Sequence, residues 1–302
     1  MPSASSFEQA KAYAAKGEGT FFDDGREIEL LHYIHSRPDV DSTLRNNPAA
    51  ILSAIDTYAR TKKYLMNVGE DKGRIVTDLI AQQTPQTMLE LGGYVGYSCI
   101  LFGAAVKQAA RAAGHPTPRY YSLERNPEFA AVIMCLVALA GLDDVVTVVV
   151  GSSDASIARL HTEGRLAGGV DMMFLDHYKP AYTTDLKLCE QLGLIVPGRT
   201  VLCADNVITP GNPPYLEYVR STVAEKRATA QKIADGEGNG VDARFADRTA
   251  KQYLKREGEA KLDVTRQGKP GLVYESQLVE SFEPSGERDG VEVTRCIGEE
   301  QI

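Results

Sequence analysis

Short apolar runs separated by helix-length stretches dominate the sequence from Pro85 onward. Each run is nearly continuous in apolar residues, which is typical of strands buried on both faces of a parallel sheet. Asn-Pro pairs and glycines mark helix starts and stops between the runs. Five strands alternate with the helices between them, which predicts a doubly wound α/β sheet. The expected strands are 87–92, 119–124, 145–151, 171–176 and 200–205, and the expected helices are 97–114, 126–141, 153–164 and 181–193.

The pattern changes near both ends of the chain. Residues 271–284 and 290–298 form two strand-like runs with a short polar turn between them, which predicts a closing antiparallel pair. Residues 48–67 and 69–83 are amphipathic, so we expect 1–84 to form a helical cover over the sheet. Residues 222–269 are charged and poor in large apolar side chains, which predicts a surface insertion, partly helical and partly mobile, within one domain spanning 1–302.

The composition narrows the class of protein. The chain has 302 residues, of which 43% are hydrophobic and 25% charged, as expected for one large globular α/β domain. A formal net charge of −8 speaks against a protein that coats nucleic acid and favours a small-molecule site. No segment has the length of a membrane span, and the first residues lack the apolar region of a signal peptide, so we expect a cytoplasmic protein with no membrane partner.

The cysteines indicate neither disulfides nor zinc. Five are present without any CxxC spacing, and most have apolar neighbours. We therefore expect free, buried thiols.

Polar residues follow the expected strands, and ligands of open α/β sheets bind beyond the carboxyl ends of strands. The first strand runs into Gly92, Gly93 and Gly96, a pattern typical either of a nucleotide-binding turn or of a structural turn. The second ends in Glu124, which either accepts hydrogen bonds from a ribose or caps the helix that follows. After the third strand, Ser153 and Asp154 are placed to meet an adenine edge.

The fourth and fifth strands end in Asp176 and in Asp205-Asn206. Two carboxylates and an amide oxygen suit a hard cation such as Mg²⁺, and two facing acids would repel without one. The alternative is that each acid caps a helix. Lys179, three residues after Asp176, is either a solvated charge or an amine that reaches the same site.

These stretches together resemble the catechol O-methyltransferase family, which depends on Mg²⁺ and S-adenosylmethionine. The matching stretches are "AIDTYARTKKYLMNVGEDKGRIV", "LELGGYVGYS", "LERNPEFAA", "MMFLDHYKPAYTTD" and "VLCADNVITPG". They occur in order between about Ile51 and Arg220, with a faint continuation through the last strands. Their combination is far more specific than any one of them.

The resemblance implies a Rossmann-like methyltransferase fold and assigns a role to each site residue. It places Glu124 at the ribose and makes Lys179 the base that takes a proton from the phenol. Next to the methionine part of the donor it places Met66, Val68, Glu90, Gly92, Tyr94 and Ser98. Around the nucleoside it places Arg125, Ser153, Asp154, Asp176 and His177; at Mg²⁺, Asp176, Asp205 and Asn206; and around the substrate, Tyr64, Tyr178, Lys179, Asn206 and Pro210.

The sequence departs from the family in two respects. Tyr64 and Tyr178 stand where the family usually has tryptophan, so the resemblance implies a catechol slot with different walls. The C-terminal acid that would bind the second hydroxyl of the catechol is Glu283 or, in another register, Glu280.

The expected activity is methyl transfer to one hydroxyl of a Mg²⁺-bound ortho-diphenol by a monomer or, at most, a weak dimer. Related substrates such as flavonoids or caffeoyl-type metabolites are alternatives. Two other functions are alternatives: a non-catalytic protein that binds S-adenosylmethionine, and an NAD-dependent oxidoreductase, which only the glycine turn suggests.

Overall fold

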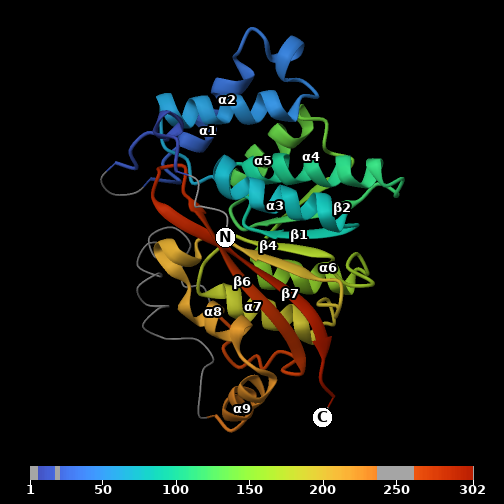
Figure 1. Cartoon of the computed structure of the whole chain (residues 1–302). Helices are drawn as coiled ribbons and strands as arrows, with labels where there is room; N and C mark the ends of the chain where they lie inside the picture. The colour runs from blue at the N-terminus through green and yellow to red at the C-terminus, as the bar shows by residue number, and fades with distance from the viewer. Residues whose placement is uncertain (1–5, 18–20, 237–261, 302) are drawn as a thin grey trace.

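A seven-stranded sheet forms the centre of the molecule, in the order β3-β2-β1-β4-β5-β7-β6 (Figure 1). The computed structural model describes residues 6–17, 21–236 and 262–301. The first five strands are parallel, and β7 runs antiparallel to both β5 and β6. These features confirm the expected Rossmann-like fold with its C-terminal antiparallel pair.

The strands fall where the apolar runs predict them. Every residue of β1, β4 and β5 is buried, as expected for interior strands covered on both faces. The winding direction reverses between β1 and β4, and this switch point opens a crevice at the carboxyl ends of the strands. The strands are Thr87–Leu91 (β1), Arg119–Glu124 (β2), Val146–Val150 (β3), Met172–Leu175 (β4), Val201–Ala204 (β5), Leu272–Phe282 (β6) and Arg288–Glu299 (β7).

Helices cover both faces of the sheet, each over its own apolar cluster. In Figure 1, α3, α4 and α5 lie on one face and α6, α7 and α8 on the other. The helices are Arg26–His35 (α1), Pro48–Thr61 (α2), Gly69–Gln83 (α3), Tyr97–Ala112 (α4), Pro127–Leu139 (α5), Ser153–Thr162 (α6), Ala181–Gln191 (α7), Pro213–Arg220 (α8) and Val223–Ala234 (α9). Short helical turns occupy Gln9–Lys11, Val40–Leu44 and Val207–Gly211.

Of the helices within the expected cover 1–84, α3 lies on the sheet, whereas α1 and α2 lie farther out. α1 packs on α5, and α2 packs on α4, so these two helices form an outer layer (Figure 1). α5 is apolar nearly all round and needs cover on its outer side as well.

The helix expected at 48–67 ends early, at Thr61. The next residues are not helical, and α3 begins at Gly69, which has a left-handed φ of 73°. This connection carries Tyr64, Met66 and Val68 to the edge of the sheet where the parallel strands end.

The described ends of the segment 222–269 contact the rest of the molecule. α9 begins with a capping box, in which the Thr222 hydroxyl accepts from the Glu225 amide and the Glu225 carboxylate accepts from the Thr222 amide. The Lys226 side chain is buried, and the Lys269 amide donates to Glu190 at 2.8 Å. Residues 237–261, the centre of the expected insertion, lie outside the described residues.

All five cysteines are free, and four of them are buried. Cys135 is exposed, against expectation, because α5 turns it toward solvent. None of the described helices has both the length and the apolar character needed to cross a membrane.

Candidate functional site

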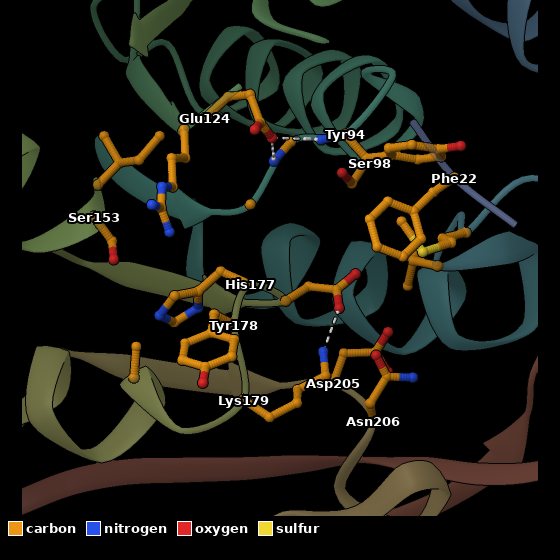
Figure 2. Close-up of a pocket in the computed structure, with 18 of the residues that line it drawn as sticks. Phe22, Tyr94, Ser98, Glu124, Ser153, His177, Tyr178, Lys179, Asp205 and Asn206 are labelled. Carbon is orange, nitrogen blue, oxygen red and sulfur yellow. Dashed lines mark hydrogen bonds and ion pairs between the residues drawn. The ribbon is translucent and has the colours of Figure 1, made fainter. Parts of the chain in front are cut away.

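A large cavity lies at the carboxyl ends of the parallel strands and has a volume of about 740 Å³. This volume is in the range of small-molecule sites. Figure 2 shows Glu124 and Ser153 toward one end of the cavity and Ser98 and Phe22 toward the other. The expected site residues that line it are Tyr64, Met66, Val68, Gly92, Tyr94, Ser98, Glu124, Arg125, Ser153, Asp154, Asp176, His177, Tyr178, Lys179, Asp205, Asn206, Pro210 and Glu283.

The glycine turn after β1 forms the floor of the cavity. Gly92 has a φ of 90°, and a Cβ there would lie 2.5 Å from the backbone oxygen of Asp176, so only glycine fits. The Gly93 and Tyr94 amides donate to Glu124 Oε2 at 3.1 and 2.9 Å (Figure 2). Glu124 Oε1 also accepts from the Asn126 amide at 2.8 Å. Glu124 therefore orients both the turn and the start of α5. A carboxylate can accept about four hydrogen bonds, so these three amides do not use its full capacity.

Glu90 is the one expected site residue outside the cavity lining. It is fully buried under the glycine turn, where Oε2 accepts from Ser122 Oγ at 2.6 Å and Cys99 Sγ at 2.8 Å. Burial raises the pKa of its carboxyl group. Glu90 lies below the turn, within β1, and supports the cavity floor; its expected place next to the methionine part of the donor stays a prediction.

A buried carboxylate joins the residues at the end of the cavity that is expected to hold the nucleoside, here called the nucleoside end. Asp185 Oδ2 accepts from Ser153 Oγ at 2.5 Å and lies 3.0 Å from His177 Nε2. The imidazole of His177 stacks on Tyr182, with ring centroids 4.8 Å apart and planes 9° apart. Asp185 on α7 therefore fixes residues that follow β3 and β4.

Asp176 and Asp205 lie at neighbouring strand ends, as expected, because β4 pairs with β5. Asn206 follows with a left-handed φ of 58°, a conformation that asparagine tolerates better than most residues. Within the described residues, no group of three or more His, Cys, Asp or Glu side chains has a metal-binding arrangement.

A fully buried lysine, Lys72 on α3, contacts three carboxylates. Its Nζ lies 2.7 Å from Asp205 Oδ1, 2.8 Å from Glu283 Oε1 and 2.8 Å from Asp289 Oδ2. Asp289 Oδ1 also accepts from the Ile208 and Thr209 amides, which anchors the turn after β5.

Burial and like charges shift the protonation of this cluster. Burial opposes the charge of Lys72, but Asp205, Glu283 and Asp289 outweigh it and hold the lysine pKa well above its ordinary value. Burial raises the pKa of Asp205 to about 6 and that of Glu283 to about 8, although Lys72 acts in the opposite direction on both. Neighbouring carboxylates add to both increases.

Lys179 is buried, unlike a solvated surface charge. Its Nζ donates to Asp176 Oδ1 at 2.9 Å, the dashed line at Lys179 in Figure 2, and to the Tyr182 hydroxyl, also at 2.9 Å. Its backbone oxygen accepts from Asn212 Nδ2 at 2.9 Å, which ties the turn to the start of α8. The amine is therefore held inside the cavity, beside the acid that ends β4.

The structure distinguishes the two candidate C-terminal acids. Glu283 lines the cavity and is 6% exposed. Glu280 is on the surface, where it pairs with Arg288 at 2.7 Å. The β6–β7 turn therefore presents Glu283 to the cavity.

Several cavity residues escaped the sequence analysis. Lys16, Phe21 and Phe22 come from the N-terminal segment, where Phe21 packs edge-on against Tyr64 with ring centroids 5.7 Å apart. Leu262 and Arg266 come from the far end of the segment 222–269. Lys72 and Asp289 complete the charged cluster. Of these, only Lys72 lies inside a stretch that carries the family resemblance.

Comparison with known proteins places the chain among methyltransferases. A family model described as "Methyltransferase domain" matches residues 89–206. "Catechol O-methyltransferase" of Bos taurus is 44% identical over 195 residues, which cover 65% of this chain and 66% of that protein. The Mus musculus protein of the same name is 37% identical over 199 residues, covering 65% of this chain and 69% of the other. The chain therefore spans about two thirds of the length of these relatives.

Among solved structures, an O-methyltransferase from Bacillus cereus in complex with SAH aligns with a TM-score of 0.49 and 19% identity. The alignment covers 88% of this chain and 94% of the other.

Proposed function

Because the chain belongs to the catechol O-methyltransferase family, we propose that it transfers the methyl group of S-adenosylmethionine to one hydroxyl of a Mg²⁺-chelated ortho-diphenol. The observation that carries this proposal is the position of Lys179. Its buried amine adjoins Asp176 in the cavity that the nucleoside-end residues also line. A proton acceptor, oxygen ligands and a nucleoside pocket are the parts that this reaction needs.

The charged cluster fits a divalent cation. The side chains of Asp176, Asp205 and Asn206 supply the all-oxygen ligand set that Mg²⁺ prefers. With all groups ionised, four carboxylates in the cluster (Asp176, Asp205, Glu283 and Asp289) face two ammonium groups (Lys72 and Lys179), so two negative charges are left. A divalent cation would balance them.

The side chains of this protein have separate parts in the reaction. When bound, Mg²⁺ would hold both hydroxyls and make the reacting one more acidic. Lys179, as the neutral amine, would take the proton from that hydroxyl. Glu283 would accept a hydrogen bond from the second hydroxyl, and Tyr64, Tyr178 and Pro210 would hold the ring in line with the methyl donor.

A methyl-transfer assay tests this function. We expect mono-methylated product from ortho-diphenols, including simple catechols, caffeoyl-type compounds and flavonoids, when S-adenosylmethionine and Mg²⁺ are present. A meta-diphenol is the matched control, because its hydroxyls are too far apart to chelate one cation. Equal rates for both, or full activity in EDTA, would contradict the proposed metal role.

We expect the apparent affinity for Mg²⁺ to rise with pH between about 6 and 8. Without metal, Asp205 and Glu283 lose their protons near these values, and a cation competes with those protons. Calorimetric titration of Mg²⁺ in buffers with different ionisation enthalpies would measure both the affinity and the proton release. An affinity that does not change with pH would show that the cation binds away from these acids.

The small-molecule partner fits this function. The cytoplasmic location, the monomeric state, and the absence of nucleic-acid and membrane partners stay predictions.

A further inference from the structure

Arg266 is a partly buried cation at the end of the cavity where Ser153 and His177 lie. Its side chain is 14% exposed, and it lines the cavity together with Leu262 and Asp263. The guanidinium lies 3.6 Å from Asp154, 3.7 Å from Asp185 and 3.3 Å from Asp263, measured between the closest nitrogen and oxygen atoms. Its Nη1 also donates to the backbone oxygen of Thr184 at 3.4 Å.

The contacts of Arg266 tie together elements that are far apart in the sequence. Asp154 lies in the first turn of α6, and Asp185 lies on α7. Residues 262–266 follow the part of the chain that the structure does not describe. One side chain from this turn therefore links both helices whose first turns border the cavity.

Asp185 relays this contact to the ligand-facing side chains. It is buried, and the same carboxylate that faces Arg266 accepts from Ser153 and contacts His177. Without the guanidinium, this buried carboxylate would lose its ion pair with Arg266 and a contact that fixes its orientation. Ser153 and His177 would then lose the fixed carboxylate that orients their side chains.

We propose that Arg266 and Leu262 form the outer wall of the nucleoside half of the methyl-donor site, and that Arg266 positions Ser153 and His177 through Asp185. The inference rests on the proposed function. It assigns a donor-binding role to a segment that the sequence predicts to be a surface insertion. Arg266 is a positioning residue, since the methyl group and Lys179 belong to the other part of the cavity.

Calorimetric titration with S-adenosylmethionine, S-adenosylhomocysteine and adenosine tests the proposal. Arg266→Ala should weaken all three by about 10- to 100-fold, the effect of losing one or two charged contacts. In the methyl-transfer assay, KM for S-adenosylmethionine should rise, while kcat at saturating donor and KM for the ortho-diphenol should not change. Arg266→Lys should recover part of the affinity.

Lys269→Ala is the matched control, because this lysine lies in the same segment and its side chain pairs with Glu299 on the surface, at 2.7 Å. It should bind donor like the wild type. The double variant Arg266→Ala with Asp185→Asn should lose little more donor affinity than the weaker-binding single variant, because both residues belong to one network of contacts.

Three outcomes separate the possible errors. A wild type that binds neither donor nor product would refute the proposed function. A wild type that binds both, with an Arg266→Ala variant that binds equally well, would refute only this inference. An Arg266→Ala variant that loses adenosine affinity and kcat together, with a lowered melting temperature, would show a general structural role instead.

Discussion

Lys179→Met is expected to lower kcat by about 10²- to 10⁴-fold, the usual contribution of a positioned general base. Methionine keeps the length of the side chain but cannot take the proton from the reacting hydroxyl. Affinity for S-adenosylmethionine should stay close to that of the wild type, because the Lys179 amine bonds to Asp176 and Tyr182 and, among the described residues, not to Glu124 or Ser153. Single-turnover methyl transfer would measure the chemical step, and calorimetry the donor affinity.

Lys107→Met is a control for the loss of one positive charge. Lys107 is a surface lysine that pairs with Asp144. Its substitution should leave kcat unchanged. A normal kcat for Lys179→Met at neutral pH would mean that solvent or another group accepts the proton.

Lys72→Met is expected to reduce the free energy of unfolding by about 3–5 kcal/mol, because it leaves buried carboxylates without their cation. The ammonium contacts Asp205, Glu283 and Asp289 and is fully buried, so water cannot replace it. Urea unfolding at pH 8 without metal would measure the loss. Added Mg²⁺ should stabilise the variant more than the wild type, because the cluster then carries one more negative charge.

The loss should depend on pH in a defined direction. Without Lys72, the folded-state pKa values of Asp205 and Glu283 rise further above their unfolded values, and the pKa of Asp289, which Lys72 helps to lower, rises as well. The folded state then binds more protons than the unfolded state, so stability falls as pH rises. The deficit should therefore be smaller at pH 5 than at pH 8.

Lys187→Met is the matched control, because it also replaces a buried lysine by methionine. Lys187 is also buried, but it lies over the Tyr218 ring at 5.0 Å and has no ion pair with any described residue. Burial lowers its pKa, so exchange for methionine should cost little or even stabilise the protein. An equal loss in both variants would show that side-chain packing, and not the carboxylate contacts, determines the effect.

The sheet could be predicted from the sequence because its strands are buried on both faces and therefore read as continuous apolar runs. The strand ends then followed from topology, which brought Asp176, Asp205 and the glycine turn to one edge. The resemblance supplied the remaining roles, including Lys179.

The rest depends on packing that no local pattern encodes. Lys72 lies on an amphipathic helix, where a charged residue is expected to face solvent, but α3 packs against β6 and β7 and the ammonium contacts acids that follow β5 and β6. Arg266 lies in a segment whose composition indicates exposure. Glu90 has the expected place in the sequence but faces the layer beneath the turn, because alternate residues of a strand point to opposite faces.

Of the seven described strands, β7 comes last in the sequence, yet it takes an interior place in the sheet, between β5 and β6. While Arg288–Glu299 is still in the ribosome, β5 has an open edge, and the lysine at the centre of the acidic cluster lacks Asp289. The nascent chain can therefore pair the strands that lead to Glu124, Ser153 and Asp176 before the acidic cluster around Lys72 is complete. An unpaired interior strand is also a site for wrong pairing with other chains, so we expect slow translation of the final segment to favour aggregation.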